Sequence, residues 1–149
     1  FVFTTGPVIT DAAATVDNVV ISATRSGRFG WVQARSIDRN VDLVEQTRQI
    51  MTAIEARLAA HGVGFDAVVK ATSLYTGGSS AAELHDNMSV RNAYYKRPGP
   101  ASTGLPVFGL ADERSRIVVD VTYAKGSANG SSGKPADGLA AVTGRTQRS

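Results

Sequence analysis

Two prolines, Pro98 and Pro100, separate a helical sequence pattern from two apolar runs near the end of the chain. Proline has no backbone N–H and its ring clashes with the preceding helical turn, so a helix has to end before this point. The apolar runs that follow, Gly104–Leu110 and Ile117–Ala124, predict strands, and the polar segment 112–115 between them predicts a turn. We therefore expect this part of the chain to form a helix followed by two strands.

The first part of the chain has three extended segments and then a long helical pattern. Residues rich in β-branching and bounded by polar breaks predict strands at Val8–Thr10, Asn18–Thr24 and Phe29–Ala34. The turn at 25–28 joins the second and third strands in a hairpin. Apolar residues at three- and four-residue steps between Val41 and Leu58 predict an amphipathic helix.

A fourth strand and a second helix complete the pattern. The strand is centred on Ala67–Thr72, and the segment 77–80 then breaks the chain. Ser80 and Glu83 have the spacing of a capping box, which predicts that a helix begins here and continues to Tyr95. The predicted order is βββαβαββ.

This order predicts an α+β domain in which a mixed β-sheet is covered on one face by two helices. The other face of such a sheet is left open and either meets water or packs on a partner, so we expect the protein to form an oligomer. The domain is expected to span residues 1–125. Residues 126–149 are rich in Gly, Ser and Ala, and this composition predicts a tail with no packed structure of its own.

Composition excludes several classes of protein. The chain has no cysteine, which rules out disulfides and thiolate chemistry and fits a cytoplasmic location. No apolar stretch approaches the roughly 18–20 residues of a membrane span. The net charge of +3 is modest, and the basic residues do not form a cluster with aromatic residues, so we expect no nucleic-acid partner. The two histidines are far apart in the sequence and predict no metal site.

Three short motifs, in this order, resemble the Rid (YjgF/YER057c/UK114) family. They are Gln46–Gln49 (Gln-Thr-Arg-Gln), Val68–Thr72 (Val-Val-Lys-Ala-Thr) and Pro100–Thr103 (Pro-Ala-Ser-Thr). The resemblance implies the Rid fold, which is similar to chorismate mutase of the AroH type. It also implies a homotrimer with clefts at the subunit interfaces and hydrolysis of reactive enamines and imines without a cofactor.

The resemblance also indicates where the site lies. In the archetypes an arginine follows Pro-Ala and holds the substrate carboxylate; here that position is Ser102. Asp120 resembles the acidic residue that positions water in the family. We predict Asp120 and Ser102 as catalytic residues. The predicted substrate-binding residues are Thr103, Leu105 through its backbone, Arg97 and Tyr94.

Several alternatives stay open at this point. Asp120 could point inward as an acid–base group or outward into solvent, because the strand around it alternates. Arg25, Arg28 and Arg91 are expected to be solvated surface residues. A Ser-His-Asp system from Ser102, His85 and Asp120 is conceivable, but nothing around Ser102 resembles a nucleophile elbow.

The functional hypothesis is a divergent Rid-like enzyme. It would hydrolyse or tautomerise a small labile metabolite, and the Ala-, Arg- and Gly-rich composition fits a role in specialised metabolism. The alternative is a trimer that binds a small ligand without catalysis. Ribonuclease action is a third interpretation, which the scattered charge disfavours.

Overall fold

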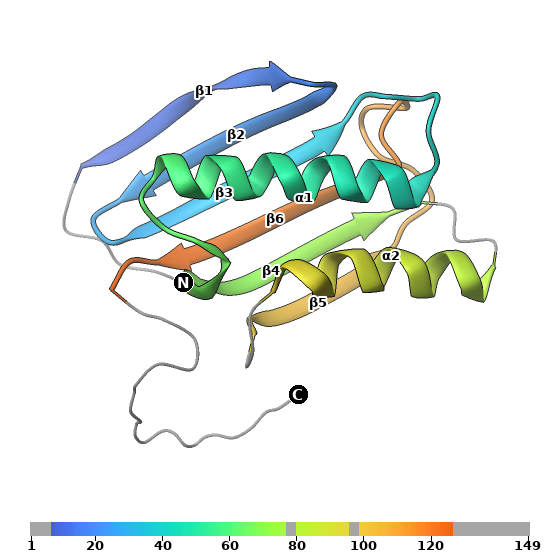
Figure 1. Cartoon of the computed structure of the whole chain (residues 1–149). Coiled ribbons are helices and arrows are strands. Elements are labelled where there is room, and N and C mark those ends of the chain that lie inside the picture. The colour runs from blue at the N-terminus through green and yellow to red at the C-terminus, as the bar shows by residue number, and fades with distance from the viewer. Residues whose placement is uncertain (1–6, 77–79, 96–98, 127–149) are drawn as a thin grey trace.

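The computed structural model describes residues 7–76, 80–95 and 99–126 of the 149-residue chain. The expected tail, 126–149, lies outside these residues except for Gly126, and so does Arg97. The elements in chain order are β1 (Val8–Val16), β2 (Val19–Ser26), β3 (Phe29–Ser36), α1 (Leu43–Ala60), the 3₁₀ turn η1 (Phe65–Ala67), β4 (Val68–Tyr75), α2 (Ala81–Tyr94), β5 (Ala101–Pro106) and β6 (Ile117–Ala124). This is the predicted order βββαβαββ (Figure 1).

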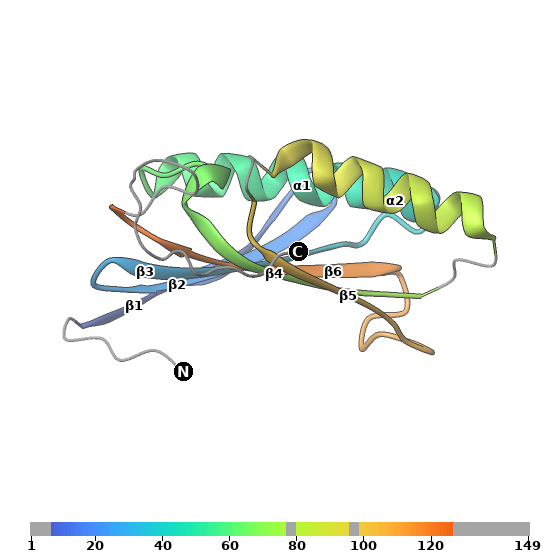
Figure 2. The same ribbon diagram turned by 90° about the horizontal axis from the view of Figure 1, so that it is seen from below.

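The strands form one six-stranded mixed sheet in the order β1-β2-β3-β6-β4-β5. Only β4 and β5 are parallel, because α2 connects them as a crossover; all other neighbouring strands are antiparallel. Figure 2 shows α1 and α2 on the same side of the sheet, so that the opposite face carries no helix. The predicted fold class is thus confirmed.

The fifth strand differs from the prediction at both ends. It covers Ala101–Pro106 instead of Gly104–Leu110. Its partner β4 ends at Tyr75, which lies opposite Pro106, and one further bond joins the Val107 N–H to the Tyr75 carbonyl. Beyond this point no strand is available for pairing, so the apolar residues up to Leu110 form a loop. Hydropathy alone did not indicate where the partner strand ends.

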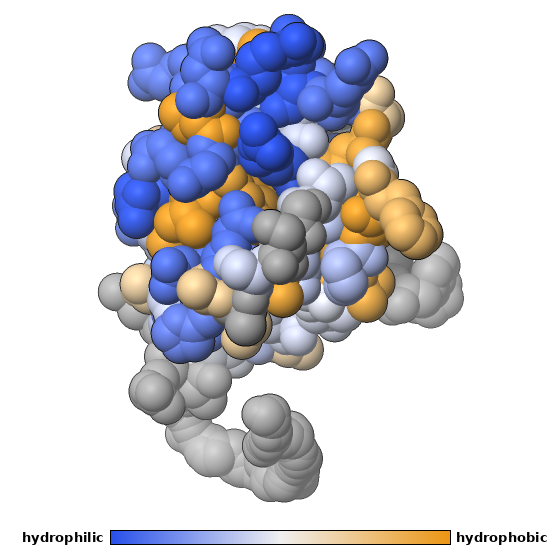
Figure 3. Space-filling view, turned by 90° about the vertical axis from the view of Figure 1, so that its right-hand side faces the viewer, coloured by the Kyte–Doolittle hydropathy of each residue, from blue (hydrophilic) through white to orange (hydrophobic). Residues whose placement is uncertain are grey.

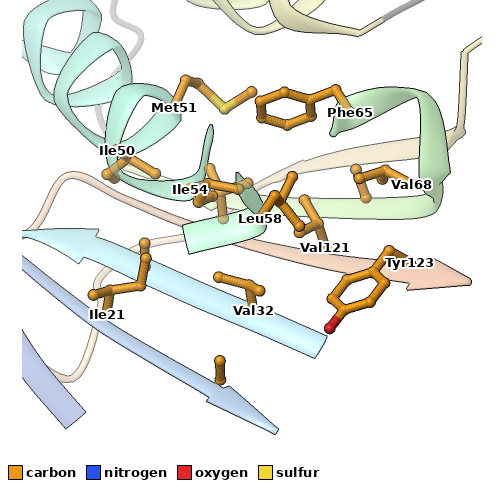
Figure 4. Close-up of a cluster of buried hydrophobic side chains, with 14 of the residues drawn as sticks. Ile21, Val32, Ile50, Met51, Ile54, Leu58, Phe65, Val68, Val121 and Tyr123 are labelled. Carbon is orange, nitrogen blue, oxygen red and sulfur yellow. The ribbon is translucent and has the colours of Figure 1, made fainter. Parts of the chain in front are cut away.

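The hydrophobic core lies between α1 and the middle of the sheet. Side chains of α1 point onto β2, β3 and β6, and Phe65 and Val68 close one end of the cluster (Figure 4). Asp42 caps the start of α1, since its carboxylate accepts a hydrogen bond from the Glu45 N–H at 2.9 Å. Four of the periodic residues that predicted this helix, Ile50, Met51, Ile54 and Leu58, are buried by it, whereas Val44 is only half-buried.

A buried glutamine fastens the start of α1 to the rest of the fold. Gln46 is fully buried, and its amide donates to the carbonyls of Asp38 and Arg114, both at 2.9 Å. Its carbonyl oxygen accepts from the Arg116 N–H at 2.7 Å. All hydrogen-bonding groups of this side chain are used within the fold, so this residue of the Gln-Thr-Arg-Gln motif supports the structure.

A second polar cluster ties the end of α1 to the sheet. His61 is buried and bonds the Tyr123 hydroxyl at 2.7 Å and the Asp11 carboxylate at 3.1 Å. The hydrogen bond from His61 lowers the pKa of Asp11. Tyr123 lies against Gly30, where an added Cβ would be 2.1 Å from the tyrosine ring. Glycine is therefore required at position 30.

Candidate functional site

A row of polar side chains crosses the open face of the sheet. Asp120 of β6 lies opposite Gln33 of β3 on one side and Thr72 of β4 on the other, and Thr72 in turn lies opposite Thr103 of β5. Residues that lie directly opposite each other in a sheet point to the same face. Four neighbouring strands thus each contribute one polar group to this row, and two of the predicted site residues, Asp120 and Thr103, belong to it.

Asp120 is partly buried although it lies on the open face. The desolvation of its carboxylate raises its pKa, and the positive charge of Lys70 partly opposes this shift. A carboxyl group with a raised pKa is suited to accept and return a proton near neutral pH. The sequence left open whether Asp120 points inward or outward into solvent. In the structure its side chain points away from the core and is nevertheless partly shielded from solvent.

Two neighbouring hollows flank the row. The smaller one has a volume of about 360 Å³ and is lined by Ser22, Ala23, Thr24, Trp31, Gln33 and Asp120. The larger one, of about 660 Å³, shares Gln33 with it and extends over Arg35, Leu74 and Val118 to the loop at 110–113. Both volumes are in the size range of small metabolites.

Arg35 brings a guanidinium group to the larger hollow. Its Nε lies 3.4 Å from Asp112, which Arg114 holds in a closer contact of 2.8 Å. The hydrogen bonds from Arg114 keep the pKa of Asp112 well below its usual range, so this carboxylate stays ionised. The contact from Arg35 uses its Nε, and its terminal nitrogens have no hydrogen bond among the described residues, so they can bind a ligand.

Sequence reasoning missed Arg35, Gln33 and Trp31, although a signal was present. The segment Phe29–Ser36 alternates, and every second residue from Trp31 onward is polar or amphipathic. A period of two places these three side chains on one face of a strand. Their shared face could have been predicted, but the sequence alone did not indicate that Asp120 lies on the neighbouring strand.

The structure separates Ser102 from Asp120. Ser102 lies opposite Ala71, and Ala71 lies opposite the buried Val121, so Ser102 points to the helix-covered side of the sheet. Leu105 alternates with it and points to the same open face as Thr103; both are exposed. The two residues predicted as catalytic therefore do not meet within one chain.

Tyr94 belongs to the helical layer. Its hydroxyl is 3.1 Å from the Thr52 hydroxyl, and its ring packs against Phe65 with centroids 5.7 Å apart. Tyr94 thus contributes to the packing of α2 on α1, on the face opposite Asp120. His85 is exposed on α2 and pairs with Asp86 at 3.6 Å, so the structure does not bring it to Asp120 either.

No group of three metal-binding side chains occurs within residues 7–76, 80–95 and 99–126. In the same part of the chain, neither helix has the length and apolar character needed to cross a bilayer. Apolar surface is present nonetheless: Leu105 and Phe108 are exposed, and Figure 3, which views this end of the molecule, shows hydrophobic surface along its right-hand edge. An exposed apolar patch of this kind is typical of an interface.

Comparison with known proteins gives a consistent result. The model of the family described as Endoribonuclease L-PSP matches residues 10–123. No curated protein matches the sequence significantly. Among solved structures, a proposed translation initiation inhibitor from Salmonella typhimurium is similar with a TM-score of 0.66 at 14% identity, over 80% of this chain and 99% of the other.

Two further structures are similar over most of their length. RidA from the Antarctic bacterium Psychrobacter sp. has a TM-score of 0.60 at 18% identity, over 76% of this chain and 93% of its own. A member of the YjgF/YER057c/UK114 family from Mycobacterium tuberculosis has a TM-score of 0.59 at 21% identity, over 68% and 83% of the two chains. At these identities the likeness concerns the fold.

Proposed function

This chain belongs to the Endoribonuclease L-PSP family, also named YjgF/YER057c/UK114 or Rid, and we propose that it hydrolyses or tautomerises a small enamine, imine or related labile metabolite. The observation that carries the proposal is the partly buried Asp120, which lines the smaller of two neighbouring hollows on the open face of the sheet. Its raised pKa supports a role in proton transfer.

The proposed chemistry needs only water and one proton carrier. In imine hydrolysis the water oxygen bonds to the carbon of the C=N group while Asp120 accepts a proton from that water. Asp120 then returns the proton to nitrogen, which gives a carbinolamine. Asp120 next carries the proton of the carbinolamine hydroxyl group to the amine nitrogen, the C–N bond breaks as the C=O bond forms, and ammonia leaves behind a carbonyl group. In tautomerisation the same carboxyl would move a proton between carbon and nitrogen. Gln33 and Thr72, opposite Asp120, would orient the water and the substrate.

We further propose that the clefts form between subunits of a homotrimer. The sheet is covered by helices on one face only, and apolar side chains such as Leu105 and Phe108 are exposed. A subunit interface would shelter the open face from water, which strengthens the electrostatic interactions there. It would also allow Ser102 of one subunit to approach Asp120 of another, which one chain does not permit. Light scattering that gives the mass of a single chain at micromolar concentration would exclude this assembly.

The charges on the open face favour a small substrate over RNA. Arg35 is paired with Asp112, and Lys70 lies on the same face as Asp120, so acidic groups alternate with basic ones. Binding of nucleic acid needs a basic surface that follows the phosphates. We therefore do not propose endoribonuclease activity, although the family carries that name.

The decisive experiment compares Asp120→Asn with the wild type. An amide keeps the shape of the side chain but cannot accept the proton, so turnover of an imino acid generated in situ by an amino-acid oxidase should fall by about 10²–10⁴-fold. Release of ammonia above background measures the turnover. Asp86→Asn, at an exposed position on α2, is the matched control and should change nothing.

Two outcomes would contradict the proposal. If Asp120→Asn releases ammonia at the wild-type rate, Asp120 does not carry the proton. If the wild-type protein binds imino acids saturably and releases no ammonia from them, the alternative of a non-catalytic ligand-binding trimer is correct. If Asp120 does not carry the proton, the rate of Asp120→Asn should also fall at low pH in the same way as the wild-type rate.

A further inference from the structure

A polar cluster is buried beneath α2, on the side of the sheet opposite Asp120. Arg91 of α2 is only 5% exposed, and Asn87, one turn earlier, is 0% exposed. The Arg91 Nε donates to the Asn87 carbonyl oxygen at 3.3 Å, and its Nη1 donates to the hydroxyl of Ser73 on β4 at 3.0 Å. Thr47 of α1 donates to the same Asn87 oxygen at 3.0 Å. The sequence-based expectation that Arg91 is a solvated surface residue is wrong.

The charge of Arg91 is not balanced within the described part of the chain. Its two hydrogen-bond partners there, Asn87 and Ser73, are neutral, and no described carboxylate lies within ion-pair distance of it. Burial lowers the pKa of Arg91, which reflects the cost of keeping a charge away from water. Arginine nonetheless stays protonated in proteins, so the cluster holds a buried positive charge with no counter-ion among the described residues.

Two buried polar groups next to Arg91 lack a hydrogen-bond partner. The Asn87 amide nitrogen is buried and has no hydrogen-bond partner, and the buried hydroxyl of Tyr95 has none either. Tyr95 lies close enough to Arg91 for the two charges to interact, because Arg91 opposes the rise in pKa that burial causes for Tyr95. Buried polar groups are almost always paired, so unpaired donors around an unbalanced cation indicate a missing acceptor.

Gly104 provides access to the guanidinium group. It is exposed, and it lies opposite Ser73 on the helix-covered face of β5. A Cβ added at Gly104 would lie 3.5 Å and 3.6 Å from the two terminal nitrogens of Arg91, and 3.6 Å from the Tyr75 ring. An oxygen atom only slightly closer would form hydrogen bonds with both nitrogens. Because residue 104 has no side chain, no atom of the described residues other than 103–105 lies closer to this place than 3.5 Å.

We propose that Arg91, Asn87 and the exposed backbone of Gly104 form a binding site for a small carboxylate between α2 and β5. The forked guanidinium matches the two oxygens of a carboxylate, which would balance its charge and accept from the unpaired donors. One cation with neutral donors suits a singly charged anion better than a doubly charged phosphate. Ser102, two residues before Gly104 on the same face and exposed, lies at the entrance.

This site is separate from the proposed reaction at Asp120, because the sheet lies between them. Acetate and pyruvate are suitable probes, and their binding to the full-length protein can be followed by NMR titration or calorimetry. Arg91→Met should weaken binding by about 10- to 100-fold, the effect of losing charge-assisted hydrogen bonds. Inorganic phosphate at the same concentration should bind more weakly than either carboxylate.

Gly104→Val gives a second, independent test. A valine side chain would occupy the ligand position while Arg91 and its hydrogen bonds remain, and a β-branched residue is compatible with an edge strand. The variant should keep its fold and lose carboxylate binding. Gly109→Ala is the matched control, since a Cβ there meets nothing within 4 Å; it should bind like the wild type. If the wild type binds neither carboxylate, or if Arg91→Met and folded Gly104→Val both bind as well as the wild type does, the proposal is wrong.

Discussion

The two helices lie on the same side of the sheet but bury side chains of opposite character (Figure 2). α1 places Ile50, Met51, Ile54 and Leu58 against the sheet, and each of them is 0% exposed. α2 turns Asn87 and Arg91 toward the sheet, and its Met88 is 51% exposed. One helix thus completes an apolar core, and the other covers a polar cluster.

The difference suggests that α1 contributes mainly to stability and that the region under α2 contributes mainly to function. Burial of apolar surface is the main source of stability, and of the two helices α1 supplies the larger share of the buried apolar side chains. A buried arginine with no counter-ion among the described residues lowers stability. The region under α2 is therefore less stable than it would be with apolar side chains in the same place. Local violations of packing rules tend to occur at functional sites. The α2 half is accordingly where we expect ligand binding and local motion.

The largest effect should come from truncating the apolar face of α1. Ile54→Ala removes a fully buried side chain from the core and should lower the free energy of unfolding by about 2–5 kcal/mol. Met88→Ala, at an exposed position on α2, should change it by less than about 0.5 kcal/mol. Urea denaturation at one protein concentration measures both. Equal losses in the two variants would show that α2 contributes as much apolar packing as α1.

The sequence predicted the first helix better than the second for a physical reason. The apolar period of α1 is the direct result of packing on a sheet, so its buried residues could be read from their spacing. α2 was recognised from its cap at Ser80 and from the prolines after it, and the pattern did not show which face it buries. Arg91 was assigned to the surface because buried arginines are rare.

The second prediction replaces the neutral partner of Arg91 with a charged one. Asn87→Asp would place a carboxylate about 3.3 Å from the Arg91 Nε and would remove the unpaired amide nitrogen. We expect the free energy of unfolding at neutral pH to rise by about 1–2 kcal/mol, and binding of acetate to be lost. Chemical denaturation and titration with acetate measure the two effects.

The gain should depend on pH with a definite sign. Arg91 would hold the pKa of the new carboxyl below its unfolded value of about 3.9, so the gain is present above that pH. It should disappear as the pH falls through the lower, folded pKa. A variant that is less stable than the wild type at pH 7 would show that the charge of Arg91 is already balanced, and the contrast between the two helices would then be smaller than we describe.

The candidate site was predictable only in part. Burial alternates along β6, so the side chain of Asp120 lies on one of the two faces, but the sequence does not say which. Its assignment as an acid–base group stays a prediction. The pairing of strands decides the face, and pairing depends on register. The β5 sequence, Ala101–Pro106, shows no alternation of apolar and polar residues that would fix its register. For this reason the sequence did not show which face of the sheet Ser102 takes and which face Thr103 takes.

The smallest expected effect compares the caps of the two helices. Asp42 accepts from the Glu45 N–H at 2.9 Å in α1, and Ser80 accepts from the Glu83 N–H at 3.1 Å in α2. Replacement by alanine should cost each helix about 1 kcal/mol. Asp42→Ala should lower the global free energy of unfolding by that amount, because α1 cannot open without breaking the core.

Ser80→Ala should act differently if α2 opens while the rest of the fold stays intact. The global free energy of unfolding would then change little, while hydrogen exchange at the α2 amides would become about fivefold faster, the equivalent of about 1 kcal/mol in a local equilibrium. Exchange measured by NMR under native conditions separates the two variants. If both lower global stability equally and α2 exchanges only by global unfolding, then α2 is as firmly docked as α1. In that case a ligand would have to reach Arg91 through Gly104 alone, with no movement of the helix.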